Sequence, residues 1–147
     1  MRLVVQRVEK AIVTRMSDHK VVGKIGRGLF VLLGVKKGDT EKEADYLVEK
    51  LFKLRVMADK DQKMNLSVAD VGGSFLIVSQ FTLHADTSGG NRPSFINAEE
   101  PVKAKKLYEY FVQKMKDKQV KVEIGSFGDY QQIETILDGT VTILFSD

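Results

Sequence analysis

Cysteine and tryptophan are absent from this chain of 147 residues, and histidine occurs only twice, as His19 and His84. Without cysteine there is no disulfide, no thiolate nucleophile and no cysteine-ligated zinc site. No apolar run approaches the ~20 residues that a membrane-spanning helix needs, and the first residues lack the hydrophobic region of a signal peptide. We therefore expect a cytoplasmic protein that does not associate with a membrane.

The charged residues nearly balance, with 23 basic and 20 acidic residues and a net charge of +3. Such a balance permits a polyanionic partner without requiring one. Seven lysines nevertheless gather toward the C-terminal side: Lys103, Lys105, Lys106, Lys114, Lys116, Lys118 and Lys121. The simplest interpretation is the solvated face of a helix, and a nucleic-acid surface is the alternative.

Hydrophobic periodicity divides the chain into strands and helices. Runs rich in β-branched residues predict strands at residues 1–8, 11–16, 20–25, 55–57, 74–78, 120–125, 131–137 and 140–145. Residues 29–35 are apolar throughout, which is typical of a central strand covered on both faces. The polar stretch from Ala58 to Met64 is expected to be a loop.

Two helices are expected between these strands. Residues 40–53 follow an N-cap at Asp39 or Thr40 and place apolar residues at helical spacing. The second helix begins within residues 98–101 and buries the stripe Ala104, Leu107, Tyr108, Phe111, Val112 and Met115. This order predicts one α+β domain over residues 1–147, a mixed, curved, barrel-like β-sheet with two main helices packed on it. Unprotected edge strands make a homodimer plausible.

The residue types leave few catalytic mechanisms open. A Ser-His-Asp site would need His19, which lies in a predicted turn, or His84, which is only two residues from Thr82. The aspartates lie scattered in loops without the spacing of a metal site, and no phosphate-binding glycine motif is present. We therefore expect neither a metal site nor a histidine-based triad.

The richest polar segment is residues 79–95, which begins at the end of an apolar strand and passes Gly89 and Gly90. Hydroxyls and backbone amides without a general base cannot perform difficult acid–base chemistry at neutral pH. They can still bind a polar substrate and stabilise an oxyanion, which suffices for a labile ester. Arg92 adds a fixed positive charge suited to phosphate or carboxylate.

The same segment carries a resemblance to a known family. Its motifs are Ser79-Gln80-Phe81-Thr82-Leu83, Ala85-Asp86-Thr87 and Gly90-Asn91-Arg92-Pro93-Ser94-Phe95. They closely resemble the signature motifs of the D-aminoacyl-tRNA deacylases, which older usage calls D-tyrosyl-tRNA deacylases. The resemblance also covers residues 1–8, 63–67, 125–128 and 138–142, and the length matches.

The resemblance implies an activity and a set of site residues. Such a protein hydrolyses the ester between a D-amino acid and the 3′-terminal adenosine of tRNA, as a homodimer with sites at the subunit interface and no cofactor. Backbone amides around Gln80, Phe81 and Thr82 would hold the reacting carbonyl, and the ribose 2′-OH of the substrate would assist. Ser79 and Gln80 would orient the site, the Thr82 hydroxyl is the first side chain to test, and Arg92-Pro93-Ser94-Phe95 would shape the adenosine pocket.

One segment departs from the family pattern. Where the family has Asn-Asp-Gly-Pro-Val-Thr, with a cis Gly-Pro peptide that reaches into the partner's site, this chain has Leu137-Asp138-Gly139-Thr140-Val141-Thr142. The Gly139–Thr140 bond is either cis, with Arg7 as a backing contact, or trans, as in a related branch with relaxed chirality. Our hypothesis is weakened chiral discrimination with ester hydrolysis retained.

Two other functions stay open at this point. The first is a non-catalytic nucleic-acid-binding relative that uses the lysine-bearing second helix. The second is a serine or threonine hydrolase that acts on another small ester, which rests only on the hydroxyl cluster.

Overall fold

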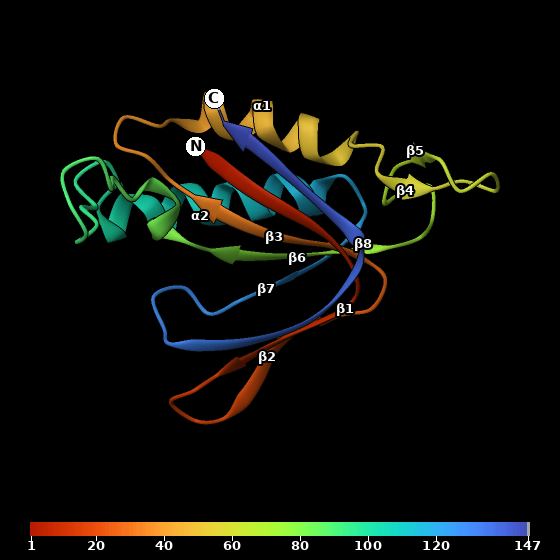
Figure 1. Cartoon of the computed structure of the whole chain (residues 1–147), viewed down its shortest axis with the longest axis horizontal. Helices are drawn as coiled ribbons and strands as arrows, with labels where there is room; N and C mark the ends of the chain where they lie inside the picture. The colour runs from red at the N-terminus through yellow and green to blue at the C-terminus, as the bar shows by residue number, and fades with distance from the viewer. Residues whose placement is uncertain (147) are drawn as a thin grey trace.

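A computed structural model of the chain describes residues 1–146 and contains one mixed sheet, a small hairpin and two α-helices (Figure 1). The strands are β1 (Arg2–Arg15), β2 (Lys20–Ile25), β3 (Gly28–Gly34), β4 (Met57–Ala58), β5 (Met64–Leu66), β6 (Ser74–Ser79), β7 (Lys121–Ile124) and β8 (Gln131–Ser146). The helices are α1 (Glu41–Phe52), the 3-10 helix η1 (Phe81–His84) and α2 (Pro101–Asp117).

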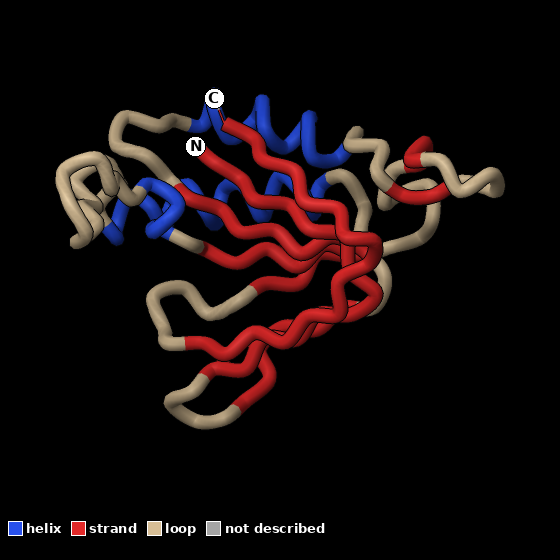
Figure 2. Tube along the Cα trace, viewed as in Figure 1, coloured by secondary structure: helices blue, strands red, loops and turns tan. Residues whose placement is uncertain are grey.

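The main sheet runs in the order β2-β1-β3-β6-β7, and β8 pairs with the other side of β1. The β1–β2, β1–β3 and β1–β8 pairs are antiparallel, whereas β3–β6 and β6–β7 are parallel. Parallel neighbours end at the same edge of a sheet, so the C-terminal ends of β3, β6 and β7 lie together. In Figure 2 the loops that follow β3, η1 and β7 lie at this edge, whereas the loops around β4 and β5 lie toward the other end of the sheet.

The strands β3 and β6 are buried on both faces, as the unbroken apolar run at residues 29–35 predicts. One face packs against the helices, where Leu29 and Phe75 join the larger core. The other face lines the inside of the curved sheet, where Phe30 and Leu76 join a second, smaller core. Burial on both faces fixes the position of the β6 end, from which the candidate site begins.

The sheet curls until β2 meets β7, which makes it nearly a closed barrel. Gly23 on β2 is the point of contact, because a Cβ atom there would lie 2.3 Å from the carbonyl oxygen of Ile124 on β7. Only glycine permits an approach this close. The expected α+β, barrel-like fold with two helices is therefore confirmed.

Both helices cover one face of the sheet (Figure 1). Thr40 is the N-cap of α1, and the Glu43 carboxylate accepts a hydrogen bond from its backbone N–H at 2.7 Å, which completes a capping box. The Tyr110 hydroxyl of α2 donates to Asp45 of α1 at 3.0 Å, which ties the two helices together. Neither helix, nor any other helix within residues 1–146, is long and apolar enough to cross a membrane.

The structure corrects three details of the expected element pattern. Residues 1–8 and 11–16 form one strand, β1, because Lys10 pairs with Ile136 of β8 and carries the ladder through the charged residues between them. Residues 131–137 and 140–145 are likewise one strand, β8, which bends and shifts register at Gly139. The expected strand at 55–57 and the expected loop at 58–64 are the short hairpin β4–β5.

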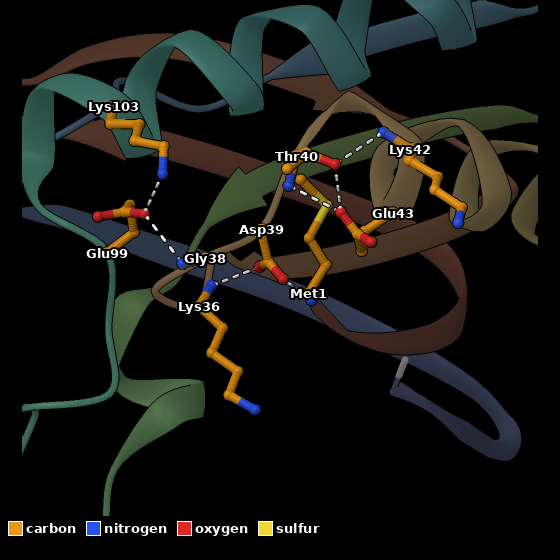
Figure 3. Close-up of polar contacts among 9 residues, drawn as sticks. All are labelled: Met1, Lys36, Gly38, Asp39, Thr40, Lys42, Glu43, Glu99 and Lys103. Atoms are coloured by element: carbon orange, nitrogen blue, oxygen red, sulfur yellow. Dashed lines mark hydrogen bonds and ion pairs between the residues drawn. The ribbon is translucent and has the colours of Figure 1, made fainter.

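The turn between β3 and α1 is held by buried charge (Figure 3). The N-terminal ammonium of Met1 lies 2.7 Å from the Asp39 carboxylate, and both groups are almost fully buried. Asp39 also accepts a hydrogen bond from the Lys36 backbone at 2.6 Å. These contacts fix the β3–α1 turn, which flanks the candidate site.

Candidate active site

The segment that carries the predicted catalytic residues changes from strand to 3-10 helix at Gln80. The Gln80 amide continues the parallel ladder by donating to the Leu33 carbonyl at 2.8 Å. The chain then turns into η1, and the Leu83 amide donates back to the Gln80 carbonyl at 3.3 Å. The amides of Phe81 and Thr82 head this helix and have no acceptor among residues 1–146.

Gly34 at the end of β3 allows η1 to dock. A Cβ atom on Gly34 would lie 3.0 Å from the Gln80 carbonyl oxygen and 3.0 Å from the Leu83 Cβ atom. On the other side, Arg2 of β1 donates to the Leu83 carbonyl at 2.5 Å. The side-chain amide of Gln80 donates to the Thr82 hydroxyl within η1. The 3-10 helix is thus held by β1, by β3 and by its own side chains.

The loop after η1 folds back on itself. Asp86 and Ser94 exchange two backbone hydrogen bonds, at 2.8 and 2.9 Å. The Asp86 carboxylate accepts from the Ser88 hydroxyl at 2.7 Å and from its amide at 2.9 Å, and the bond from the hydroxyl is the main reason that the pKa of Asp86 is lowered. This fold-back returns Phe95 to η1, where its ring meets the Phe81 ring with centroids 5.0 Å apart.

A groove of about 620 Å³ opens beside the end of β6. Four of the predicted site residues line it, namely Ser79, Gln80, Phe81 and Phe95. Its second wall is the start of α2 with the residues before it, which include Glu99, Pro101 and Ala104. Its third wall is the segment 127–131 between β7 and β8. A concave, largely apolar groove with a few polar groups is the usual form of a small-molecule site.

The wall formed by residues 127–131 was not among the sequence-predicted site residues. The Gln131 side chain shapes it by accepting a hydrogen bond from the Ser126 amide at 2.6 Å, and the Phe127 ring packs on Tyr108 of α2. The signal available in the sequence was Gly128, which adopts φ +80° in the structure. A glycine in this turn indicates a constrained loop but carries no chemistry of its own.

The remaining predicted residues of the segment lie outside the groove walls. Thr82 is exposed on η1, and its hydroxyl accepts the hydrogen bond from Gln80. Arg92, Pro93 and Ser94 lie exposed in the loop that follows. Of the residues expected to shape an adenosine pocket, only Phe95 therefore contributes to the groove of the single chain.

Arg7, Gly139 and Thr140 lie together at the bend of β8. The Nε atom of Arg7 lies 3.3 Å from the Asp138 carbonyl and 3.0 Å from its carboxylate, and Nη1 donates to the Val56 carbonyl at 2.7 Å. The Gly139–Thr140 peptide bond is cis. The sequence left the isomer open, and the structure has the alternative in which Arg7 backs the bond.

This bend is remote from the groove within one chain. Ser79 of β6 pairs with Leu33 of β3, and Leu33 pairs with Leu3 of β1. Gly139 lies farther along β1, beside Arg7, where the β1–β8 register shifts between the Gln6 and Val8 pairs. Three strand spacings of about 4.8 Å and four residues of about 3.3 Å separate the two places, or roughly 20 Å. Figure 1 shows the end of β6 and the bend of β8 at opposite ends of the sheet.

The charged groups of the groove are carboxylates. Glu99 accepts from Lys103 at 2.8 Å, from the Glu100 amide at 3.1 Å and from the Gly38 amide at 3.4 Å (Figure 3). The hydrogen bond from Lys103 is the main reason that its pKa is lowered. Asp129 is the other carboxylate of the groove walls. Glu99 is therefore ionised at neutral pH and saturated with donors.

Neither histidine is placed to act as a base in the groove. His19 is exposed in the β1–β2 turn, as expected. His84 is the buried last residue of η1, and its Nε2 atom has no hydrogen-bond partner within the described residues. Residues 1–146 also contain no group of three or more side chains suited to hold a metal ion. Besides the two carboxylates, the groove offers backbone amides, hydroxyls, side-chain amides and aromatic rings.

Comparison with known proteins assigns the chain to a family. Residues 4–146 match the family model described as D-Tyr-tRNA(Tyr) deacylase. The D-aminoacyl-tRNA deacylase of Thermosipho melanesiensis is 53% identical over 145 residues, which cover 98% of this chain and 95% of that protein. The D-aminoacyl-tRNA deacylase of Koribacter versatilis is 52% identical, with coverage of 98% and 95%.

Solved structures show the same fold. The c-Myc DNA unwinding element binding protein is similar with a TM-score of 0.93 and 37% identity, which cover 100% of this chain and 99% of that one. A probable eukaryotic D-amino acid tRNA deacylase has a TM-score of 0.80 at 18% identity, with coverage of 98% and 97%, and shares the fold. Because the family model and relatives of about half identity span nearly the whole chain, the chain belongs to the D-aminoacyl-tRNA deacylase family.

Proposed function

We propose that this protein hydrolyses the ester bond of D-aminoacyl-tRNA and releases the free amino acid and tRNA. The observation that carries the proposal is the position of the family's motif residues, since Ser79, Gln80 and Phe81 line the groove beside β6. Relatives of about half identity that are named as D-aminoacyl-tRNA deacylases support the substrate. The place of action would be the cytoplasm, where this substrate is used.

The catalytic groups we propose are the backbone amides of Phe81 and Thr82. Both lack an acceptor among residues 1–146, whereas the Gln80 backbone amide already donates to the Leu33 carbonyl and is not available. A well-aimed amide that stabilises the oxyanion of an acyl-transfer intermediate contributes about 3–4 kcal/mol. The Gln80 side chain would orient Thr82, and Ser79 would fix the start of the turn.

The reaction would not use a protein side chain as general base. The histidines are outside the groove, the Glu99 carboxylate already accepts three hydrogen bonds, and the Asp129 carboxylate accepts one from the Ser126 hydroxyl. Aminoacyl esters are activated, so positioning and oxyanion stabilisation account for much of the required rate enhancement. In this scheme the Thr82 hydroxyl helps to hold η1 in place and does not attack the ester.

We also propose a homodimer in which a second copy completes the site. Gly139 and Thr140 lie roughly 20 Å from Ser79 within one chain by strand spacing, so they can join the groove only from another copy. The strand β8 has one free edge and exposes Ile136, Leu137 and Leu144, an apolar surface suited to such contact. Arg7 would then hold the inserted bend in shape.

The terminal adenosine of the tRNA would lie against the aromatic pair. Phe81 and Phe95 expose 55% and 37% of their surface, and both line the groove, where a base can stack on them. Arg92, Pro93 and Ser94 lie in the adjoining loop, where the Arg92 guanidinium suits a phosphate. In this proposal, substrate binding rests on one aromatic wall and one exposed cation.

The test is deacylation of D-aminoacyl-tRNA by the wild type and by the Thr82→Val variant. We expect the wild type to be active and Thr82→Val to retain activity within about tenfold, because the hydroxyl is not the nucleophile. Loss of a true nucleophile costs on the order of 10⁴-fold or more. An inactive wild type would refute the proposal, and a loss of that size in Thr82→Val would refute the backbone mechanism.

A control substrate separates a general esterase from a tRNA-specific enzyme. Simple D-amino-acid esters lack the adenosine, so we expect them to react far more slowly than D-aminoacyl-tRNA. Comparable rates on both would favour a hydrolase for other small esters.

Nucleic-acid binding without hydrolysis is the second candidate function. The structural neighbour at 37% identity is named for binding a DNA unwinding element, and α2 of this chain is rich in lysine. Affinity for DNA or tRNA that falls steeply with salt, together with no deacylation, would support this function over the first.

A further inference from the structure

Four of the five lysines of α2 fall on two edges of the helix, and the fifth, Lys106, lies on the exposed face between these edges. Lys105 and Lys116 are 11 residues apart, which is about three helical turns, so they lie on one edge. Pro101 and Ala104, which line the groove, lie toward the same edge, and Tyr108 packs there on Phe127. This edge therefore runs from the groove along the side of α2 that faces β7.

The opposite edge carries lysines that contact the protein itself. Lys103 lies 2.8 Å from the Glu99 carboxylate, and Lys114 lies 5.2 Å above the centre of the Tyr110 ring. Beyond the helix end, Lys118 pairs with Glu49 of α1. These contacts give the lysines on the α1 side a role within the fold.

The lysines on the groove side make few or no contacts with other side chains of the described residues. Lys116 is exposed and makes no ion pair with any described residue. Lys105 is 56% exposed, and its contact with the equally exposed Glu109 is 3.9 Å long, a distance at which a surface pair contributes little. Lys121, at the start of β7, is also exposed.

We propose that Lys105 and Lys116 bind the phosphate backbone of the tRNA acceptor stem while its 3′ end occupies the groove. This inference rests on the proposed function and adds the partner surface to it. The two ammonium groups start about 16 Å apart along the helix, and a nucleic-acid strand carries a phosphate every few ångströms of its axis. Continuity with the groove and complementary charge favour this occupant.

Replacement of Glu109 should change tRNA affinity in the opposite direction to replacement of the lysines. It lies on the same exposed side of α2, between the two lysines, and is 61% exposed. A carboxylate there repels a phosphate backbone, so its removal strengthens binding if the backbone lies along this edge. A merely solvated helix face would show neither effect.

The first experiment measures binding of tRNA that carries no amino acid to the full-length protein. We expect Lys105→Ala with Lys116→Ala to weaken binding about tenfold and to lower the slope of log affinity against log salt by about 0.7–0.9 per lysine. Glu109→Gln should tighten binding about twofold to threefold. Lys114→Ala on the opposite edge is the matched control and should bind as the wild type does. Equal affinity of the double variant and the control would overturn the inference.

The second experiment measures deacylation of D-aminoacyl-tRNA and of 3′-D-aminoacyladenosine. The ratio of kcat/KM on the first substrate to that on the second should fall about tenfold in the double variant, because only the tRNA extends beyond the groove to Lys105 and Lys116. An unchanged ratio would overturn the inference while the proposed function stands. If no variant hydrolyses either substrate, the proposed function fails and the tRNA-binding comparison alone decides the inference.

Discussion

The rings of Phe81 and Phe95 meet edge to face, at an interplanar angle of 67° with centroids 5.0 Å apart. The two residues come from opposite ends of a folded-back loop, which Asp86 and Ser94 close through their backbones. The pair forms one wall of the groove and joins η1 to the segment that precedes α2. If the groove binds substrate as proposed, this one aromatic contact couples substrate binding to the order of the loop.

Replacement of Phe95 by alanine should weaken substrate binding more than it weakens the fold. A base that stacks on an aromatic side chain contributes about 1–3 kcal/mol to binding, whereas an aromatic pair within the fold contributes about 0.5–1.5 kcal/mol beyond its buried area, so we expect KM for D-aminoacyl-tRNA to rise about fivefold or more. Ile96→Ala is the matched control, because Ile96 is 67% exposed and lies outside the groove walls. Equal effects of the two changes in steady-state kinetics would contradict this role for Phe95.

Replacement of Gly34 by alanine should displace η1. The added Cβ atom would lie 3.0 Å from the Gln80 carbonyl and 3.1 Å from the His84 ring, so neighbouring atoms must move. We expect a loss of about 1–3 kcal/mol in unfolding free energy and a fall in kcat measured well below the Tm. Gly89→Ala, where a Cβ atom would contact nothing within 4 Å, is the control. Normal kcat in Gly34→Ala would show that the position of η1 is not critical.

Stability should fall at low pH partly through Glu99. Its pKa is lowered in the folded state, mainly by Lys103, from an ordinary value of 4.5. A group with a lowered folded-state pKa stabilises the fold above its unfolded pKa and loses that contribution as pH falls through the folded-state value. The loss in Tm between pH 5 and pH 3 should therefore be smaller in Glu99→Gln than in the wild type. Glu134→Gln, which removes an exposed carboxylate on β8, is the control for charge alone.

Thr140→Pro should make the enzyme more selective for D-amino acids. Proline fixes φ and removes a backbone N–H, whereas threonine leaves φ free and adds a hydroxyl at this exposed position. We expect the wild type to hydrolyse glycyl-tRNA or L-aminoacyl-tRNA measurably beside D-aminoacyl-tRNA, and Thr140→Pro to lose these side activities. Strict use of the D-substrate by the wild type, at the rate of its relatives, would refute the idea.

The elements of the fold were largely predictable because the spacing of apolar residues along the chain follows which side chains are buried. The sequence of β3 is apolar on both faces, because one face packs against the helices and the other faces the interior of the barrel. The errors arose where tertiary pairing overrides local pattern. Glu9 and Lys10 look like a break, yet the ladder with β8 continues past them. The single strand β8 follows for the same reason, since β1 pairs with it on both sides of Gly139.

The candidate site was predictable in part. The groove is lined by Ser79, Gln80 and Phe81, whose motif is recognisable in the sequence. They lie there because the buried strand β6 ends at this edge of the sheet. The wall at residues 127–131 could not be predicted, since its shape depends on the Gln131 side chain and on the packing of Phe127. The 3-10 helix was also missed, because its docking depends on Gly34, which lies far away in the sequence.

The distance between the end of β6 and the bend of β8 has a consequence for mixtures of two inactive variants. In the proposed dimer every site takes its oxyanion donors from one copy and Gly139 from the other, so a defect in either half damages a different site. Two inactive proteins, one altered at η1 and the other at Gly139, should therefore complement each other when mixed and allowed to exchange subunits. Each heterodimer would contain one site built wholly from intact halves beside one in which both halves are damaged.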